Sequence, residues 1–261
     1  MVLKEKILIR EDNNGICNLI LNRPSAHNAL SFKLLSSIKD EINLIKEDKR
    51  IRVLIISANG PSFCSGHDLK EINSNKNKND YDKLFNLCSE VMLSLLKLNI
   101  PVIAKIHSTA TAAGCQLVAT CDLAIASTNA KFATPGVNIG LFCSTPMVAL
   151  SRNISNKHSM EMLLNGDLIS SKKAAEIGLI NEVVNDNDLE RIVLEKALKI
   201  SKKSSMTLKI GKQAFYNQIN MNLSEAYDYA SNVMVENMLK IDAEEGIDAF
   251  INKRNPNWQD K

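Results

Sequence analysis

The sequence predicts an α/β protein with a helical C-terminal extension. In the first part of the chain, apolar runs of strand length such as Val53–Ala58 and Val102–Ile106 alternate with helical patterns. From about Ser144 onward the helical period dominates. Alternating strands and helices are typical of βα crossovers and of a mostly parallel sheet. The 261 residues are enough to bury a substantial core.

The chain opens with two short runs that favour strands, Lys6–Arg10 and Ile16–Leu21. Asn14-Gly15 lies between them, and Asn-Gly between two such runs is a strong signal for a β-hairpin. Ser31 then has the character of a helix N-cap. The helix that it begins is expected to reach about residue 45, because apolar side chains recur on one face, namely Leu34, Leu35, Ile38, Ile42 and Ile45.

The middle of the chain contains a continuous apolar run, Val53–Ala58, that predicts a buried strand. An amphipathic helix is expected over Tyr81–Leu98, before Pro101. Between them, Asn73–Asn79 is polar throughout, and its composition predicts a mobile loop. A strand, a helix and a strand are expected next, over Val102–Ile106, Gly114–Ala119 and Asp122–Ala126.

The last third of the chain is expected to be almost entirely helical. Thr145 is a candidate N-cap with Pro146 at the first helical position. The pattern continues to about Phe250, with breaks at Gly166, Gly178, Asn185-Asp186 and Ser204. We expect a core over residues 1–195 and a helical region over 196–261 through which copies of the chain associate into an oligomer.

The composition excludes several classes of protein. Hydrophobic residues make up 45% and charged residues 23%, as in an ordinary globular protein. A net charge of +3 is too small to indicate nucleic-acid binding, although it is compatible with an acidic small ligand. No apolar run approaches the roughly 20 residues needed to span a membrane. We therefore expect neither a nucleic-acid partner nor a membrane.

The six cysteines (17, 64, 88, 115, 121 and 143) are scattered and form no CxxC pair. Buried, reduced thiols are expected rather than a disulfide framework or a zinc site. The first residues, Met1 to Lys6, contain neither a signal-peptide pattern nor an Arg- and Ser-rich presequence. These observations predict a cytoplasmic protein.

Two segments combine small residues with a strand-to-helix transition. The first is Phe63–Glu71, which follows the strand at 53–58, and the second is Ala112–Leu117, which follows the strand at 102–106. Small side chains leave backbone N–H groups uncovered near a helix N-terminus, which favours negative charge. Two such groups aimed at one point would form an oxyanion hole. Each segment taken alone is more readily interpreted as a tight strand-to-helix turn.

Further short motifs accompany these two segments in a fixed order along nearly the whole chain. They are Leu21-Asn22-Arg23-Pro24 with Asn28-Ala29-Leu30, Phe63–Lys70, Ala112–Asp122, Phe132 through Gly140, and Ile169-Ser170 with Ala174-Ala175 and Gly178 through Val184. Two further segments belong to this set of motifs, namely residues 133–146 and the ending with Ala249-Phe250, Lys253 to Pro256 and Trp258. In this order the motifs resemble those of the crotonase (enoyl-CoA hydratase/isomerase) superfamily.

The resemblance implies a crotonase-like spiral of ββα units and a protein that processes acyl-CoA thioesters. It implies that the backbone N–H groups of His67 and Ala113 form an oxyanion hole for a thioester enolate. It also implies a homotrimer or a dimer of trimers, with no metal and no covalently bound cofactor, because coenzyme A is part of the substrate. The implied coenzyme A contacts are Arg23, Ser65, Gly66, Asp68, Leu69 and Lys70.

The chain departs from the family pattern at two positions. Where family hydratases carry a glutamate after the Gly-Cys pair and another after a later proline, this chain has Gln116 and Gly136. Hydration needs groups that exchange protons near neutral pH, and each such group contributes typically 10²–10⁴-fold. An amide has no useful proton to exchange, and glycine has no side chain. The ring of His67 is expected to serve packing, with an acid–base role as the alternative.

No other residue of the motifs is an evident substitute. Asn138, Cys143, Ser144 and Thr145 lie on the same segment as Gly136, and only the thiol could become a base, if its pKa were lowered. Two functions remain open. One is an acyl-CoA-processing enzyme with an altered active site, and decarboxylation or thioester cleavage would suit it better than hydration. The other is a non-catalytic acyl-CoA-binding protein.

Overall fold

The larger of two sheets in the computed structural model has the strand order β1-β2-β3-β5-β7-β10. The structure describes residues 6–74 and 76–261, so Met1 to Glu5 lie outside it. β1 is antiparallel to β2 and the other neighbours are parallel, which confirms the mostly parallel sheet. The strands are β1 (Leu8–Asn13), β2 (Ile16–Leu21), β3 (Val53–Ala58), β5 (Val102–Ile106), β7 (Leu123–Ser127) and β10 (Glu182–Val184).

A smaller sheet runs alongside with the order β4-β6-β8-β9. Its strands are β4 (Ser62–Cys64), β6 (Thr109–Thr111), β8 (Lys131–Ala133) and β9 (Ile169–Ser170). The chain repeatedly places one strand in the large sheet, the next in the small sheet, and then forms a helical segment. This repetition confirms the predicted spiral of ββα units. It also brings the turns after β4 and β6 side by side, because these two strands are paired.

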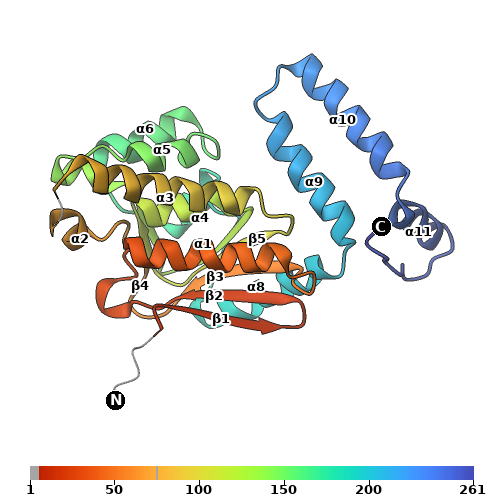
Figure 1. Ribbon diagram of the computed structural model, residues 1–261, viewed down its shortest axis with the longest axis horizontal. Helices are drawn as coiled ribbons and strands as arrows, with labels where there is room; N and C mark the ends of the chain where they lie inside the picture. The colour runs from red at the N-terminus through yellow and green to blue at the C-terminus, as the bar shows by residue number, and fades with distance from the viewer. Residues whose placement is uncertain (1–5, 75) are drawn as a thin grey trace.

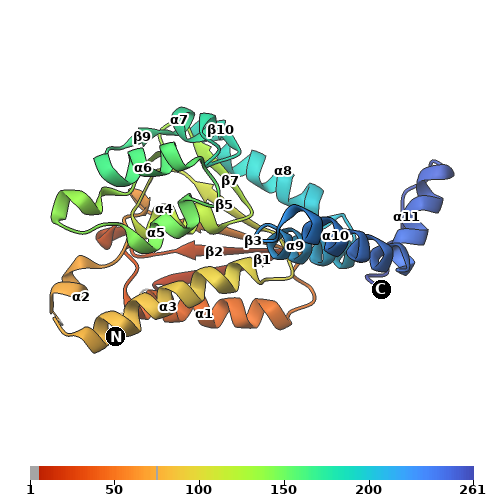
Figure 2. The same cartoon turned by 90° about the horizontal axis from the view of Figure 1, so that it is seen from above.

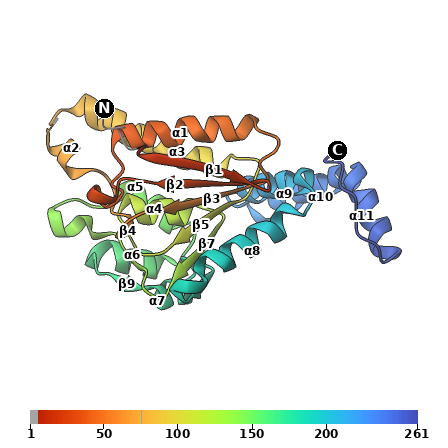
Figure 3. The ribbon, with the colours of Figure 1, turned by 90° about the horizontal axis from the view of Figure 1, so that it is seen from below.

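Helices cover both faces of the large sheet. α1 (Phe32–Glu47) and α3 (Lys78–Leu96) lie on one face, and α8 (Leu189–Ser201) lies on the other (Figures 2 and 3). Successive side chains of a strand point to opposite faces. On β3, Leu54 and Ile56 accordingly join the core on the α1 side, whereas Val53 and Ile55 pack toward α8.

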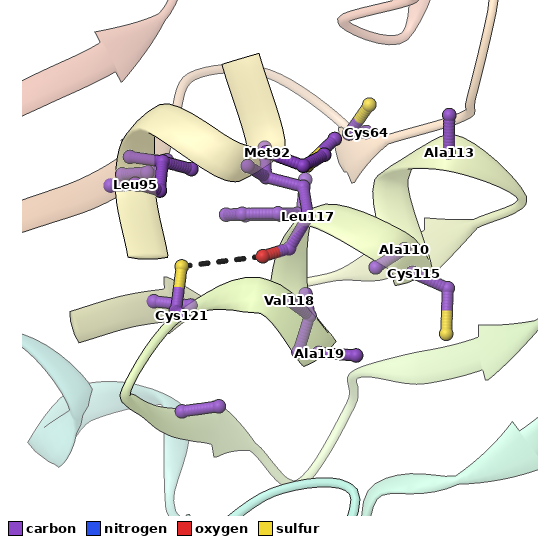
Figure 4. Close-up of a cluster of buried hydrophobic side chains, with 14 of the residues drawn as sticks. Cys64, Met92, Leu95, Ala110, Ala113, Cys115, Leu117, Val118, Ala119 and Cys121 are labelled. Carbon is purple, nitrogen blue, oxygen red and sulfur yellow. Dashed lines mark hydrogen bonds between the residues drawn. The ribbon is translucent and has the colours of Figure 1, made fainter. Parts of the chain in front are cut away.

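Helix α4 (Ala113–Thr120) is buried along its whole length, which explains why it carries no charged residue. Figure 4 shows it packed among Met92 and Leu95 of α3 and Cys64 of β4. Cys121, just after the helix, donates its S–H to the Leu117 carbonyl. All six cysteines are free and buried, as expected from the sequence. A helix inserted this deeply can place its N-terminus at the bottom of a pocket.

The last three helices extend away from the sheets, as Figure 1 shows. They are α9 (Ser205–Gln218), α10 (Leu223–Met238) and α11 (Ile241–Ile251). Lys212 of α9 ties them to the core, because its Nζ donates to the Asp122 carboxylate at 2.7 Å and to the carbonyls of Leu95 and Ile100 at 3.0 Å. Tyr216 donates to the same carboxylate at 2.8 Å. Asp122 thus connects α9 to the core.

Many large apolar side chains on these three helices face solvent in the single chain. They include Phe215, Leu223, Tyr227, Met234, Val235, Met238, Phe250 and Ile251. Exposed apolar side chains gathered on one surface are typical of the surfaces through which protein chains associate. The predicted division at residues 195/196 stays a prediction. Helix α8 runs through it and packs on the sheet through Val193 and Ala197.

Several predicted elements are correct and others need correction. The hairpin forms, with positive φ at Asn14 and Gly15, and Ser31 caps α1. The polar stretch 73–79 is wrong as a structureless loop, apart from Asn75, which lies outside the described residues. α2 (Leu69–Ser74) includes its start, and the side chain of Asn77 caps α3 by accepting from the Asp80 N–H.

The helical prediction for the last third is also too broad, because β9 and β10 lie within it. Thr145 is not an N-cap, since α5 (Ser144–Leu150) begins one residue earlier. The breaks are correct: Gly166 ends α6 (Asn156–Asn165), Gly178 follows α7 (Ser171–Glu176), and Asn185 and Ser204 precede η3 (Asp186–Asp188) and α9. None of the helices among the described residues is long and apolar enough to cross a membrane.

Candidate active site

The loop after β2 is closed by a buried asparagine. Asn28 is fully buried, and its amide donates to the carbonyls of Asn59 and Ser62 at 2.8 Å each. Its Oδ1 accepts from the Arg23 N–H at 2.7 Å. The loop also contains η1 (Pro24–Ala26). These bonds join the loop to the segment before β4, so the turn after β4 starts from a fixed position.

The turns after β4 and β6 are in direct contact, and two glycines make that possible. A Cβ on Gly114 would lie 2.2 Å from the Cys64 carbonyl oxygen, so only glycine lets α4 approach β4 this closely. Gly66 has φ +97°, and a Cβ there would lie 2.8 Å from the Ala112 Cβ and 3.3 Å from the Ala113 nitrogen. The structure therefore brings the two sequence motifs together.

The backbone at this junction is strained. Ala112 has φ 50° and ψ −120°, a conformation that L-residues rarely adopt. It is held by its own N–H, which donates to the Ala133 carbonyl at 2.9 Å. The chain turns at Ala112 in such a way that the Ala113 N–H, the first of α4, has no acceptor within the described chain. The His67 N–H, in the other turn, has no acceptor there either. Strain of this kind persists where surrounding structure enforces it, commonly at functional sites.

A cavity of about 480 Å³ opens beside these two N–H groups. This volume is within the range of small-ligand pockets. The walls come from the turn after β4, from α2 and α3, from the N-terminus of α4, and from the segment 135–146. The lining residues include no Asp, Glu, Lys or Arg from the described chain, and the largest are Leu69, Ile72, Phe85, Ile139, Leu141 and Phe142.

The His67 side chain lines the cavity, but its ring nitrogens are turned away from open space. The ring packs edge-on against Phe85, with centroids 5.1 Å apart. Neither ring nitrogen is exposed or has a hydrogen-bond partner within residues 6–74 and 76–261. Burial lowers the pKa of the His67 imidazole, and the nearby Leu30 carbonyl offsets this only in part. This environment favours the neutral ring and is compatible with the expected packing role.

The two positions that depart from the family pattern differ in their surroundings. Gln116 is buried on α4, and its Oε1 finds no partner among the described residues. Gly136 lies in η2 (Pro135–Ile139) and lines the cavity. A Cβ on Gly136 would lie 2.5 Å from the Leu141 carbonyl oxygen and 2.9 Å from the Cys143 sulfur. The chain itself thus fills the space into which a side chain at 136 would extend.

The other polar residues of this wall offer no base. Asn138, Cys143, Ser144 and Thr145 all line the cavity. Burial raises the pKa of the Cys143 thiol, and the Gly136 N–H counteracts that only partly. The thiol is therefore protonated at neutral pH. Glu90 lies on the exposed face of α3 and pairs with Lys39.

The comparisons with known proteins bear on this site. The model of the enoyl-CoA hydratase/isomerase family matches residues 11–261. The chain belongs to this family. It is 46% identical over 245 residues to the rat enoyl-CoA hydratase domain-containing protein 3, covering 94% of this chain and 82% of that protein. The human protein of the same name is 44% identical over 245 residues, covering 94% of this chain and 81% of that one.

Solved structures of the family agree with the fold. An enoyl-CoA hydratase from Mycobacterium smegmatis has a TM-score of 0.95 at 44% identity, with 97% of this chain and 99% of that one covered. The human domain-containing protein 3 has a TM-score of 0.94 at 42% identity, with 97% and 100% covered. The crotonase-like fold expected from the motifs is confirmed.

The comparison with the family's named members corrects one expectation. The rat, mouse, frog, human and zebrafish relatives are all named as mitochondrial. The cytoplasmic location predicted above is therefore wrong. It depended on the pattern of the first few residues, and such a pattern does not decide the compartment of a family member.

The predicted coenzyme A contacts of this family member lie in two groups. Ser65 and Leu69 line the cavity, and Gly66 contacts the second turn. Arg23 and Asp68 instead pair with each other at 2.8 Å. Asp68 also caps α2 through its contacts with the N–H groups of Lys70 and Glu71. Burial opposes ionisation of Asp68, but the Arg23 hydrogen bond and these N–H groups outweigh it and hold its pKa below the ordinary value.

Sequence reasoning missed the wall formed by α2 and α3. Ile72 and Phe85 line the cavity, although neither belongs to the motifs that carry the family likeness. One signal was available for Phe85. It lies next to the buried stripe of α3, which includes Leu84 and Cys88, and it is a large apolar residue on an otherwise polar face. In the part of the chain that the structure describes, no cluster of His, Cys, Asp and Glu could hold a metal ion.

Proposed function

We propose that this enoyl-CoA hydratase/isomerase family member binds acyl-CoA thioesters and stabilises a thioester enolate with the N–H groups of His67 and Ala113. The observation that supports the proposal is the meeting of two uncommitted N–H groups at one apolar cavity. A developing oxyanion placed there would receive two hydrogen bonds in a water-poor site. Removing one such donor typically costs 10²–10³-fold in rate.

The neighbouring elements strengthen this electrostatic role. Ala113 is the first residue of α4, so the positive end of the helix dipole faces the same point. The buried helix lies in a low-dielectric environment, in which the dipole is less screened than at a surface. Gly66 and Gly114 let the two turns lie in direct contact, as an oxyanion hole made from both N–H groups would require.

The reaction is proposed to differ from standard hydration. Hydration needs a base to activate water and an acid to protonate the α-carbon. Gln116 supplies neither, and Gly136 has no room for a side chain. Reactions that need less acid–base assistance, such as decarboxylation or thioester cleavage, are more compatible with this cavity.

A second candidate is a non-catalytic acyl-CoA-binding protein. The lack of an available acid or base along the described cavity wall favours it. Among the described residues that line the cavity, the titratable side chains are His67 and Cys143. The ring nitrogens of His67 are buried, and burial raises the pKa of the Cys143 thiol. Such a protein would keep the oxyanion hole as a carbonyl-binding device.

The same proposal covers coenzyme A and the assembly. The turn around Ser65–Leu69 would hold the pantetheine and adenine, and the exposed Lys70 would lie near the phosphates. The apolar surface on α9–α11 would be buried between copies in a homotrimer or a dimer of trimers.

The decisive experiment measures binding and turnover on the same preparation. Binding of coenzyme A, acetyl-CoA, crotonyl-CoA and dodecanoyl-CoA is measured by calorimetry, and hydration, decarboxylation and thioester cleavage are assayed on a thioester panel. Binding with turnover in a reaction other than hydration supports the enzyme, and binding without turnover supports the second candidate. Crotonyl-CoA hydration at ordinary hydratase rates would show that the acid–base groups are misassigned. Failure of every thioester to bind would contradict both candidates.

A further inference from the structure

A second cavity, of about 320 Å³, lies next to the first, between the N-terminal end of α1, α2 and the start of α3. Ile72 lines both cavities, and within the described chain no other residue does. Its side chain is therefore part of the wall between them. Among the described residues, the lining of the second cavity consists of Phe32, Glu71, Ile72, Asp80, Tyr81, Lys83 and Leu84.

The lining of the second cavity is mixed. Phe32, Ile72 and Leu84 provide apolar surface, and Leu84 is only 5% exposed. Polar surface comes from Tyr81, Glu71, Asp80 and the exposed Lys83. The apolar members of this lining would accommodate the end of an unbranched aliphatic chain that extends past Ile72.

The wall residue is held from both sides. The Ile72 N–H donates to the Asp68 carbonyl at 3.0 Å, and Asp68 is itself paired with Arg23. The neighbouring Glu71 accepts from the Phe32 N–H at 2.9 Å, which ties α2 to the start of α1. These bonds fix the backbone of α2 at Ile72 relative to the start of α1, so a side chain at this position can act as a size limit.

We propose that Ile72 limits the length of the acyl chain and that removing its side chain joins the two cavities. This inference rests on the proposed function, since it takes the first cavity as the acyl site. The absence of charge among the described residues that line the first cavity points to an uncharged aliphatic acyl group. Each methylene buried contributes about 0.8 kcal/mol, or roughly fourfold in affinity. Affinity should rise with chain length until the chain meets Ile72.

The test measures dissociation constants for saturated acyl-CoA thioesters of 4, 8, 12 and 16 carbons in the wild type, Ile72→Ala and Ile72→Phe. In Ile72→Ala the increase should continue to longer chains, so that the affinity ratio of the longest to the shortest thioester rises by about tenfold or more. In Ile72→Phe the increase should stop at shorter chains. Leu69→Ala is the matched control, because Leu69 lies on the same helix and lines only the first cavity.

The outcomes separate the two proposals. If all thioesters bind and the folded Ile72 variants show the same dependence on chain length as the wild type, the inference is overturned while the proposed function stands. If Leu69→Ala extends the range as much as Ile72→Ala, the wall is misassigned. If no thioester binds to the wild type, the proposed function itself fails. Circular dichroism of each variant establishes that it is folded.

Discussion

The carbonyl oxygen of Leu141 lies 2.5 Å from the point that a Cβ on Gly136 would occupy. This contact predicts that Gly136→Ala lowers the free energy of unfolding by about 1–3 kcal/mol, because backbone atoms of 141 must move to admit one methyl group. Urea denaturation measures the change. Gly211→Ala is the matched control, since nothing lies within 4 Å of its Cβ position on α9. It should stabilise by roughly 0.5–1 kcal/mol. Equal effects of the two variants would contradict the contact.

The same contact predicts that placing glutamates at positions 116 and 136 does not by itself produce an active hydratase. Gln116→Glu combined with Gly136→Glu should remain far below ordinary hydratase rates on crotonyl-CoA, because the carboxylate at 136 cannot enter the cavity while Leu141 and Cys143 occupy its place. Adding Cys143→Ala removes one of the two obstacles. Full hydratase activity in the double variant would contradict this prediction, because it would show that residues 141–143 move readily to admit a side chain at position 136.

Ala113→Pro provides a test of the oxyanion hole that spares the helix. Proline is tolerated at the first position of a helix, and it removes the N–H. The turnover of whichever thioester the wild type processes should fall about 10²–10³-fold. If no turnover is found, the absorbance maximum of bound 2,4-hexadienoyl-CoA should shift less far to the red, because one donor to the carbonyl is lost. Ala113→Ser keeps the N–H and should behave like the wild type.

The burial of the His67 ring predicts that the free energy of unfolding depends on pH. Because burial lowers the pKa of its ring in the folded state, the unfolded chain binds the proton more readily. The neutral ring is fully compatible with folding above the ordinary pKa of about 6.5. Stability is then lost as the pH falls from that value toward the folded-state pKa. His67→Leu should flatten the change in urea midpoint between pH 7 and pH 5, and identical slopes in the two proteins would refute the assignment.

Alanine substitutions at Arg23 and Lys70 should affect different properties: the first should lower stability, and the second should weaken coenzyme A binding. Arg23→Ala leaves the Asp68 cap without its partner and should cost about 1–2 kcal/mol in unfolding free energy, as expected for a half-buried charged hydrogen bond. Lys70→Ala should leave stability unchanged and weaken coenzyme A binding by about two- to fivefold, with a smaller effect at high salt. Calorimetry at two salt concentrations and urea denaturation measure both quantities.

Much of the fold could be predicted because local pattern and global position agree. The continuous apolar run Val53–Ala58 is buried on both faces, and its composition shows that directly. The capping of α3 was missed, because the composition around Asn77 predicts a polar loop. In the structure, the Asn77 Oδ1 accepts a hydrogen bond from the Asp80 N–H. A single side chain can begin a helix inside a segment whose composition suggests none.

The site was predictable only where it is made of backbone turns. Gly66 and Gly114 stand out in the sequence, since tight turns and close approaches need glycine. The contribution of Ile72 could not be predicted, because it depends on how α2 packs across the cavity, and for Phe85 the sequence offered only the one signal noted above. Nor does the sequence show that Leu141 occupies the space beside Gly136, since that follows from the path of the chain after η2.

The bonds from Lys212 to Asp122 and to the carbonyls of Leu95 and Ile100 bear on the association proposed for α9–α11. They hold α9 against the core within the single chain. If copies of the chain associate through α9–α11 as proposed, α9 is ordered beforehand and loses little chain entropy on assembly.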